Sequence, residues 1–267
     1  MPTYRHGRHE HGQTFLTDRA VIARIVESVS RTSGPIIEIG PGDGALTVPL
    51  ASLERPLTAV EIDPRLASRL RTKLPHRVEV VAGDFLRHRL AVSPHVIVGN
   101  LPFHLTTAML RHLLHAPGWT DAILLVQWEV ARRRAGVGNS TMMTAQWAPW
   151  FSFTLEGRIP AAAFTPRPGV DGGLLHVRRL VQPEVVSSKR KQYQALVHAV
   201  FTGRGRGLGQ ILARNTSLGI RANGWLHHHG LSSNSLPGNM SNTAWIDLFR
   251  TTGISPPRRR RGRNPHC

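Results

Sequence analysis

Cysteine is almost absent from this sequence of 267 residues, since Cys267 at the last position is the single one. One cysteine excludes an intrachain disulfide and any metal site built on several thiolates. Long apolar runs are lacking too, because no stretch approaches the ~20 residues that a membrane-spanning helix requires. Residues 1–12 are polar and rich in His and Arg, so we expect no secretory signal and a cytoplasmic location.

Acidic residues and lysines are also few. Asp and Glu total 16 against 34 Lys and Arg, which gives a formal net charge of +18. The lysines are only Lys73, Lys189 and Lys191, so arginine carries nearly all of the positive charge. This imbalance favours a polyanionic partner, because neutralised phosphates release their condensed counterions. A nucleic acid fits better than a membrane surface, and a charge bias without function is the alternative.

Short β-branched segments alternate with helical patterns over the first part of the chain. The alternation predicts an α/β fold with a mostly parallel, doubly wound sheet, in which ligands bind beyond the carboxyl ends of the strands. Gly40, Glu61, Asp84 and Asn100 each close or follow a strand, so we expect them at that edge. Expected strands are residues 36–39, 57–62, 78–81, 96–98 and 122–126, and expected helices are residues 45–53, 64–74, 106–115 and 127–135.

The pattern changes after residue 150. Residues 151–159 and 174–180 predict a terminal hairpin, and residues 181–184 are interpreted as a domain boundary. Beyond it, residues 189–201 and 245–250 predict helices. We therefore expect a basic segment at 1–15, an α/β domain at 16–181, a small C-terminal helical domain at 182–253 and a disordered Arg-rich tail at 254–267.

A glycine-rich turn stands between the first expected strand and the first expected helix. Gly40, Gly42 and Gly44 permit a tight turn and close approach of the backbone to a ligand. Their GxGxG spacing differs from the GxGxxG of most nicotinamide enzymes and is a weak signal by itself. Glu61 closes the second strand, where it can accept hydrogen bonds from both hydroxyls of a ribose. Together these residues indicate a nucleoside-containing cofactor, either S-adenosylmethionine or NAD.

Three more side chains at this edge are candidates for the same site. Asp84 can accept a bond from an adenine amine of the cofactor, with Phe85 stacking on the ring; a turn aspartate beside a core phenylalanine is the alternative. Glu38 lies inside the first strand, where a carboxylate is costly unless it is bonded. It would hold either the glycine loop or the ammonium group of the cofactor, and the sequence does not choose between them.

The tetrapeptide at residues 100–103 follows the fourth expected strand. The amine of adenine is a poor nucleophile, because its lone pair is delocalised into the ring. Two acceptors that take its protons in hydrogen bonds draw the nitrogen toward tetrahedral geometry: the side-chain carbonyl of Asn100 and the backbone carbonyl of Leu101. Pro102 holds that backbone rigid, and Phe103 offers a face for a flipped-out base. This predicts methyl transfer to an adenine amine, with an ordinary strand-to-turn exit as the alternative.

These segments resemble the ribosomal RNA adenine N6-dimethyltransferases. Residues 38–42, 61–63, 83–84 and 100–103 have that family's order and spacing, residues 12–16 resemble its N-terminal cofactor segment, and residues 164–168 resemble its late aromatic-proline motif. Within the family the chain is similar to the Erm branch, the macrolide-resistance enzymes that act on 23S ribosomal RNA. Residues 127–134 carry this similarity, as does Phe103, where the housekeeping branch usually has Tyr. The resemblance covers about residues 5–250.

The resemblance implies a Rossmann-like, seven-stranded class I methyltransferase sheet and S-adenosyl-L-methionine as methyl donor. It implies that Phe164 packs near the target base, opposite Phe103. It further implies mono- or dimethylation of one adenine of 23S ribosomal RNA by a monomer, before full ribosome assembly, with resistance to macrolides, lincosamides and streptogramin B. Thr14 stands where the family usually has Asn, and the backbone at this position could still make the N-terminal contact with the cofactor. The implied cofactor site is lined by Thr14, Leu16, Gly40, Glu61, Asp84 and Asn100.

Arginines outside the cofactor segments predict contacts with RNA. Arg132, Arg133 and Arg134 follow the fifth expected strand, near the predicted active-site edge. Arg204 and Arg206 lie in a glycine-rich stretch where the backbone can approach phosphate closely. Solvated basic faces are the alternative for both groups. Residues 227–229 are three consecutive histidines, but their side chains would point in different directions on a helix, so we predict no metal site.

Three other functions compete with this interpretation. A housekeeping enzyme that dimethylates two adjacent adenines of small-subunit ribosomal RNA would share most of these segments. A nicotinamide oxidoreductase would explain Gly40 and Glu61 but would leave residues 100–103 without a role. An RNA-binding protein without catalysis would explain the charge but not the cofactor segments.

Overall fold

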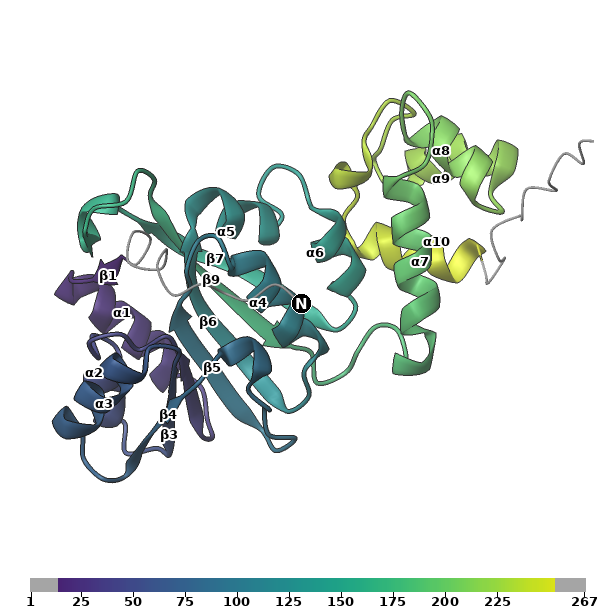
Figure 1. Ribbon diagram of the computed structural model, residues 1–267. Coiled ribbons are helices and arrows are strands. Elements are labelled where there is room, and N and C mark those ends of the chain that lie inside the picture. The colour runs from purple at the N-terminus through teal and green to yellow at the C-terminus, as the bar shows by residue number, and fades with distance from the viewer. Residues whose placement is uncertain (1–13, 253–267) are drawn as a thin grey trace, which may run out of the picture. The chain divides into compact units, whose positions relative to one another are not determined.

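Seven strands form the main sheet of the computed structural model, which describes residues 14–252 (Figure 1). They are β2 (Ile36–Ile39), β3 (Leu57–Glu61), β4 (Val78–Ala82), β5 (His95–Asn100), β6 (Trp119–Gln127), β7 (Phe151–Ile159) and β9 (Gly172–Arg179). The order across the sheet is β4-β3-β2-β5-β6-β9-β7. Strands β2 to β6 pair in parallel, and β9 pairs antiparallel with both β6 and β7. The predicted α/β fold and the predicted terminal hairpin are confirmed.

Local sequence explains why the sheet is covered on both faces. All four residues of β2 are buried, as expected for a parallel strand between helical layers. The connection from β3 to α3 (Pro64–Lys73) ends at Asp63, whose Oδ1 accepts a hydrogen bond from the Arg65 N–H at 2.7 Å, with Pro64 in the first position of α3. The helices of this part are α1 (Arg19–Ser30), α2 (Thr47–Ala51), α3 (Pro64–Lys73), α4 (Thr106–His115) and α5 (Trp128–Arg134), with the 3-10 turns η1 (Phe85–Arg87) and η2 (Ala161–Ala163).

Helix α1 has no counterpart among the expected helices. Asp18 caps it by accepting hydrogen bonds from the Ala20 and Val21 N–H groups at 2.8 and 3.1 Å. Ile25 and Val29, one turn apart, are buried in a hydrophobic core cluster that also contains Ile36 of β2 and Val98 of β5. A capping aspartate followed by apolar residues at helical spacing was therefore the signal that predicts this helix.

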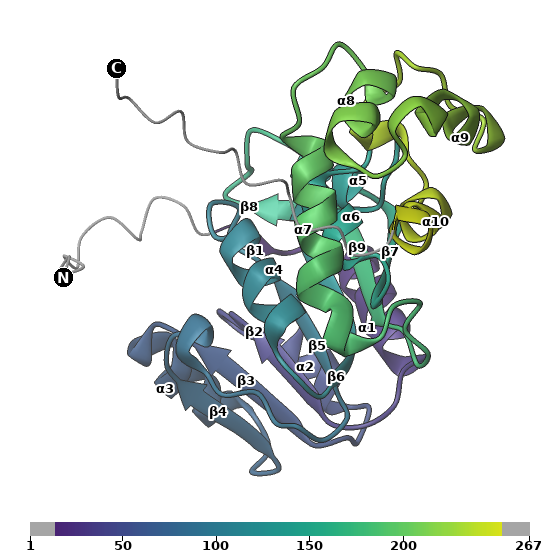
Figure 2. The same cartoon turned by 90° about the vertical axis from the view of Figure 1, so that its right-hand side faces the viewer.

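A short second sheet joins two segments that are far apart in the sequence. Strand β1 (Phe15–Leu16) pairs antiparallel with β8 (Phe164–Thr165), and the two lie side by side in Figure 2. The N–H groups of Thr17 and Asp18 both point to the carbonyl of Ala163, at 2.9 and 3.2 Å. This pair of strands, which we call the β1–β8 ribbon, ties the start of α1 to the turn that follows β7.

The chain divides into two units. The α/β unit comprises the residues up to Ala135 together with Phe151–Leu180, and the helical unit comprises Gly136–Trp150 together with the residues from Val181 onward. The helical unit contains α6 (Met142–Trp147), α7 (Arg190–Phe201), α8 (Leu208–Asn215), α9 (Ala222–His228) and α10 (Asn242–Thr252), with η3 (Ser187–Lys189), η4 (Gly219–Arg221) and η5 (Pro237–Asn239).

The units differ from the expected division at Gly136–Trp150, which was expected in the α/β domain. Packing explains this: the Tyr193 hydroxyl donates a hydrogen bond to the Ala145 carbonyl at 3.0 Å, and the Trp150 ring meets the Tyr193 ring edge-on at 5.6 Å. The expected basic segment falls outside the described residues except for Thr14 and Phe15, and the expected Arg-rich tail falls outside them entirely. Within residues 14–252, no helix has the length and apolar character to cross a membrane.

Candidate functional site

A cavity of about 600 Å³ opens at the carboxyl edge of the sheet in the α/β unit. Its wall comes from the β1 segment, the glycine loop after β2, the ends of β3, β4 and β5, and the start of α4. These segments are well separated in the chain, and the parallel sheet brings them to one edge. The predicted residues in the wall are Thr14, Leu16, Gly40, Gly42, Glu61, Asp84, Phe85, Asn100, Leu101 and Pro102.

The glycine loop needs its glycines for both conformation and space. Gly40, Gly42 and Gly44 have φ values of 62°, 55° and 90°, which side chains with a Cβ rarely adopt. A Cβ at Gly42 would also lie 3.0 Å from the Phe15 ring. Phe15 lines the cavity and was not among the predicted site residues; the need for glycine at position 42 is apparent only once the β1 segment is placed.

Glu61 fastens this loop to the end of β3. Its Oε2 accepts a hydrogen bond from the Gly42 N–H at 3.0 Å, and its Oε1 accepts one from the Asp63 N–H at 2.9 Å. The side chain is buried at 3 % exposure and lines the cavity. Because each carboxylate oxygen has two lone pairs, both oxygens retain an acceptor position for a diol.

Asp84 and Phe85 each have a structural contact within the protein and also line the cavity. Asp84 caps η1 by accepting a hydrogen bond from the Leu86 N–H at 2.9 Å, and it also lines the cavity. Phe85 is 3 % exposed, and its ring meets the His112 ring edge-on at 5.6 Å. The Phe85 side chain therefore belongs to the core while one part of it closes the cavity wall.

Glu38 is a buried carboxyl group that lines the cavity. Its side chain is 1 % exposed, and Oε2 accepts no hydrogen bond from any described residue. Burial, together with the charge of nearby Glu61, raises the pKa of Glu38 from 4.5 to about 8. A group with one unsatisfied oxygen beside an open cavity is suited to a cationic ligand atom.

The raised pKa of Glu38 predicts that the ligand-free protein loses stability as pH rises. The folded state keeps a proton that the unfolded state releases above pH 4.5, so stability falls between pH 4.5 and about 8, by roughly 3–5 kcal/mol. Glu38→Gln removes this dependence and makes the variant more stable than the wild type at pH 8.5. Urea denaturation at pH 5 and pH 8.5 measures the free energy of unfolding of both proteins. If both lost the same stability between these pH values, the raised pKa of Glu38 would be contradicted.

Asn100 is oriented by the segment that precedes α1. Its Nδ2 donates a hydrogen bond to the backbone carbonyl of Thr14 at 3.0 Å. Because only the nitrogen of the amide can donate to a carbonyl, this bond distinguishes Nδ2 from Oδ1 and leaves Oδ1 as the acceptor on the cavity side. Thr14 thus takes part through its backbone.

The residues after Asn100 shape the turn at the end of β5. The Leu101 N–H donates to the Leu125 carbonyl at 2.9 Å, and the Pro102 carbonyl accepts from the Leu105 N–H at 2.9 Å, which starts the turn into α4. In the part of the chain that the structure describes, no protein group donates to the Leu101 carbonyl. The acceptor expected from Leu101 is available in this geometry.

The two aromatic residues expected at the target base are not part of the cavity wall. Among the described residues, the wall lacks both Phe103 and Phe164. Phe103 is half-buried, whereas Phe164 is 2 % exposed and belongs to the same hydrophobic core cluster as Leu16 and Ile159. The expected face of Phe164 beside the base is therefore not presented in this conformation, because β8 turns the ring into the core.

The arginines expected to contact RNA lie in both units. On α5, Arg132 and Arg133 have nitrogens 3.0 and 4.0 Å from Oε2 of Glu129, and Arg134 is half-buried. Arg133 is the most exposed of the three. In the helical unit, Arg206 and Arg214 line a second cavity of about 370 Å³ without a carboxylate in its wall, and Arg204 is exposed nearby in sequence.

Among residues 14–252, no group of three or more His, Cys, Asp or Glu side chains lies close enough together to hold a metal ion. Of the three histidines at 227–229, His229 instead lies against Asp247, with Nε2 3.0 Å from Oδ2.

Comparison with known proteins agrees with this geometry. The family model of ribosomal RNA adenine dimethylase matches residues 5–252. An rRNA adenine N-6-methyltransferase from Corynebacterium diphtheriae is 59% identical over 231 residues, covering 86% of this chain and 90% of the relative. The mycinamicin-resistance protein MyrB from Micromonospora griseorubida is 45% identical over 245 residues, covering 91% and 78%. Among solved structures, the 23S rRNA methyltransferase ErmE matches with a TM-score of 0.83 at 34% identity, covering 89% of this chain and 99% of ErmE.

The match extends over nearly the whole described chain and includes both the sheet and the segments around the cavity. The resemblance inferred from the sequence is confirmed, and the class I methyltransferase fold with it. Enzymes of this fold and family use S-adenosylmethionine as the methyl donor. The chain belongs to the ribosomal RNA adenine dimethylase family, as an Erm-family rRNA adenine N6-methyltransferase.

Proposed function

We propose that this protein methylates the N6 amine of one adenine in 23S ribosomal RNA and thereby confers resistance to macrolides, lincosamides and streptogramin B. The observation that carries the proposal is Asn100, whose amide is fixed by Thr14 at the mouth of a cavity that also holds Glu61. The names of two relatives, the mycinamicin-resistance protein MyrB and the 23S rRNA methyltransferase ErmE, support the substrate and the phenotype.

The residues around the cavity fit S-adenosylmethionine. Glu61 keeps acceptor positions for the ribose hydroxyls, and Asp84 in the cavity wall would accept a hydrogen bond from the adenine amine. The unsatisfied Oε2 of Glu38 suits the ammonium group of the methionine part. Gly40 and Gly42 let the backbone approach closely, and Leu16 contributes an apolar surface. When bound, this cofactor supplies a methyl group made electrophilic by a sulfonium.

The chain's own contribution to the chemistry is to prepare the amine. Asn100 Oδ1 accepts one N6 proton in a hydrogen bond and the Leu101 carbonyl accepts the other, which localises the nitrogen lone pair. Pro102 keeps the Leu101 carbonyl in place, since its own carbonyl is held by Leu105. Phe103 would stack on the flipped-out base after a side-chain movement from its half-buried position, with Phe164 supporting the site from the core.

Primer extension tests the substrate directly. Deproteinised 23S and 16S ribosomal RNA are incubated separately with the protein and S-adenosylmethionine. The proposal expects a stop at one adenine of 23S RNA and no stop on 16S RNA. A pair of modified adjacent adenines on 16S RNA would instead identify the housekeeping activity.

RNA binding is proposed for the arginines Arg132, Arg133, Arg134, Arg204 and Arg206, of which Arg133, Arg204 and Arg206 are exposed and Arg132 and Arg134 are half-buried. In the helical unit, the sequence from Val185 to Ile246 contains no Asp or Glu, so Arg206 and Arg214 have no acidic residue near them along the chain. We place the protein in the cytoplasm as a monomer, acting on the RNA before full ribosome assembly.

Arg133→Ala is expected to weaken binding of a 23S RNA fragment about fivefold and to reduce the salt slope of log K by about one. Arg133 is the most exposed arginine of α5, and its ion pair with Glu129 spans 4.0 Å, so a phosphate can displace it. Filter binding over a range of salt concentrations measures both quantities. Arg65→Ala, an exposed arginine of α3, is the matched control and should change neither.

A further inference from the structure

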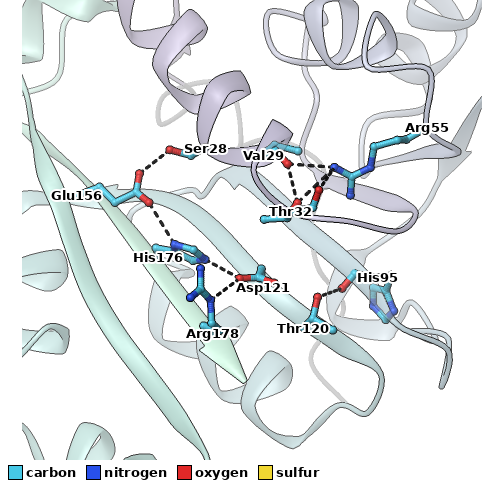
Figure 3. A network of polar contacts seen from close by, with 10 residues as sticks. All are labelled: Ser28, Val29, Thr32, Arg55, His95, Thr120, Asp121, Glu156, His176 and Arg178. Carbon is cyan, nitrogen blue, oxygen red and sulfur yellow. Dashed lines mark hydrogen bonds and ion pairs between the residues drawn. The ribbon is translucent and has the colours of Figure 1, made fainter. Parts of the chain in front are cut away.

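A cluster of charged side chains crosses the last three strands of the sheet beneath α1 (Figure 3). His176 of β9 lies between Asp121 of β6 and Glu156 of β7. Its Nε2 is 2.8 Å from Oδ1 of Asp121, and its Nδ1 is 3.2 Å from Oε1 of Glu156. The side chains are 13–21% exposed, and the wall of the cavity includes none of these described residues. The cluster is thus separate from the site already described.

The geometry requires a charged imidazole. Both ring nitrogens face a carboxylate oxygen, and a neutral ring has only one N–H to donate. The hydrogen bond to Glu156, with that to Asp121, outweighs burial and raises the pKa of His176 above its ordinary 6.5. Arg178 adds a second cation, with Nε 3.0 Å from Asp121 Oδ1. The four groups are therefore neutral in sum when His176 is protonated, and negative when it is not.

Glu156 also holds helix α1. Its Oε2 accepts a hydrogen bond from the Ser28 hydroxyl at 2.7 Å, and its backbone carbonyl accepts one from the Arg24 guanidinium. Glu156 lies where the register of β7 against β9 shifts, next to Gly157 with φ of 153°. One glutamate therefore bonds α1 with both its side chain and its backbone while its other carboxylate oxygen faces His176.

The two elements that meet at Glu156 also carry the two strands of the β1–β8 ribbon. Strand β1 leads directly into α1, and β7 leads through η2 into β8. The ribbon sets the position of the Thr14 carbonyl, which orients Asn100 at 3.0 Å. Movement of α1 against β7 would therefore displace the segment that lines the cavity at Thr14 and Leu16.

We propose that His176 is a positioning residue, which in its charged form holds Glu156 against Ser28 and Arg24 and so fixes the ribbon for cofactor binding. The sign follows from the raised pKa: the contacts are complete below it and are lost as pH rises through it, because a neutral ring has one N–H and leaves one of its two contacts with a carboxylate without a proton. Cofactor affinity should therefore fall on the alkaline side. This inference rests on the proposed cofactor site.

The test compares the dissociation constant of S-adenosylhomocysteine for the wild type and for His176→Gln by calorimetry at pH 6 and pH 9. The variant should bind about five- to tenfold more weakly at pH 6, and within about twofold of the wild type at pH 9. The ratio of the two proteins removes contributions that they share, such as that of Glu38. A ratio that is the same at both pH values would overturn the proposal, because a residue with a purely structural role lowers stability without that dependence.

Ser28→Ala keeps the proposal testable if His176→Gln does not fold. It cuts the link to α1 while leaving His176, Asp121 and Glu156 intact, so it should also weaken binding at pH 6. His115→Gln, an exposed histidine of α4, is the matched control and should follow the wild type at both pH values. If Ser28→Ala bound S-adenosylhomocysteine as tightly as the wild type does at pH 6, the proposal would be contradicted.

NMR of the His176 ring nitrogens reports the cluster without any ligand. Two protonated nitrogens are expected at pH 6, and a ring that is neutral at that pH would overturn the proposal. This measurement separates a failure of the cluster from a failure of the proposed cofactor site.

Discussion

Asn100→Ala is expected to lower the rate of methyl transfer by about 10²–10³-fold or more, since one of two acceptors aimed at the reacting amine is lost. RNA affinity should not change, because the side chain carries no charge. The affinity for S-adenosylhomocysteine should fall only modestly, through loss of the bond from Nδ2 to the Thr14 carbonyl. Single-turnover transfer from labelled S-adenosylmethionine measures the rate, and Asn242→Ala, an exposed residue at the start of α10, is the control.

Asn100→Asp distinguishes this arrangement from general base catalysis. A carboxylate is the stronger base, so a base mechanism predicts that Asp preserves the activity. In this structure the amide nitrogen of Asn100 donates a hydrogen bond to the Thr14 carbonyl. The second carboxylate oxygen of Asp cannot donate and would face that carbonyl oxygen instead. We therefore expect Asn100→Asp to be as inactive as Asn100→Ala; activity near that of the wild type would refute the assigned role.

Glu61→Ala is expected to weaken binding of S-adenosylhomocysteine by about 100-fold. Two hydrogen bonds to a charged acceptor are removed, each worth about 1.5–3 kcal/mol, and the loop loses its anchor at Gly42. Glu61→Gln keeps one of the two oxygens as an acceptor, so its affinity for S-adenosylhomocysteine should fall about tenfold. Calorimetry with S-adenosylhomocysteine measures both constants.

The control for Glu61 is Glu79→Gln on the neighbouring strand β4, an exposed side chain that accepts a bond only from the Thr58 hydroxyl among the described residues. It should bind like the wild type. If Glu61→Ala bound S-adenosylhomocysteine as tightly as Glu79→Gln does, the cofactor would not lie against Glu61.

The sheet was predictable because its determinants are local. The isoleucine-rich strand at Ile36–Ile39 and the cap at Asp63 before Pro64 each specify their element without help from distant residues. The convergence of Gly40, Glu61, Asp84 and Asn100 at one edge then follows from parallel pairing. Local patterns at the ends of strands therefore located most of the cavity wall.

The parts that could not be predicted depend on contacts between distant segments. Nothing near Phe15 indicates that it pairs with Thr165, so the ribbon and the Thr14 carbonyl opposite Asn100 emerge only from the fold. An aromatic residue in a motif does not reveal on which side of its strand the core lies, and Phe164 turned out to face the core. Residues 136–150 joined the helical unit through packing on Tyr193, which has no local signature.

The structure of the protein with S-adenosylhomocysteine bound tests the central claim most directly. We expect the ribose hydroxyls on Glu61, the sulfur next to Asn100, and the Asn100 amide still donating to Thr14 with Oδ1 directed at the place of the target amine. A cofactor bound outside this cavity, or an Asn100 amide turned away from it, would contradict the account.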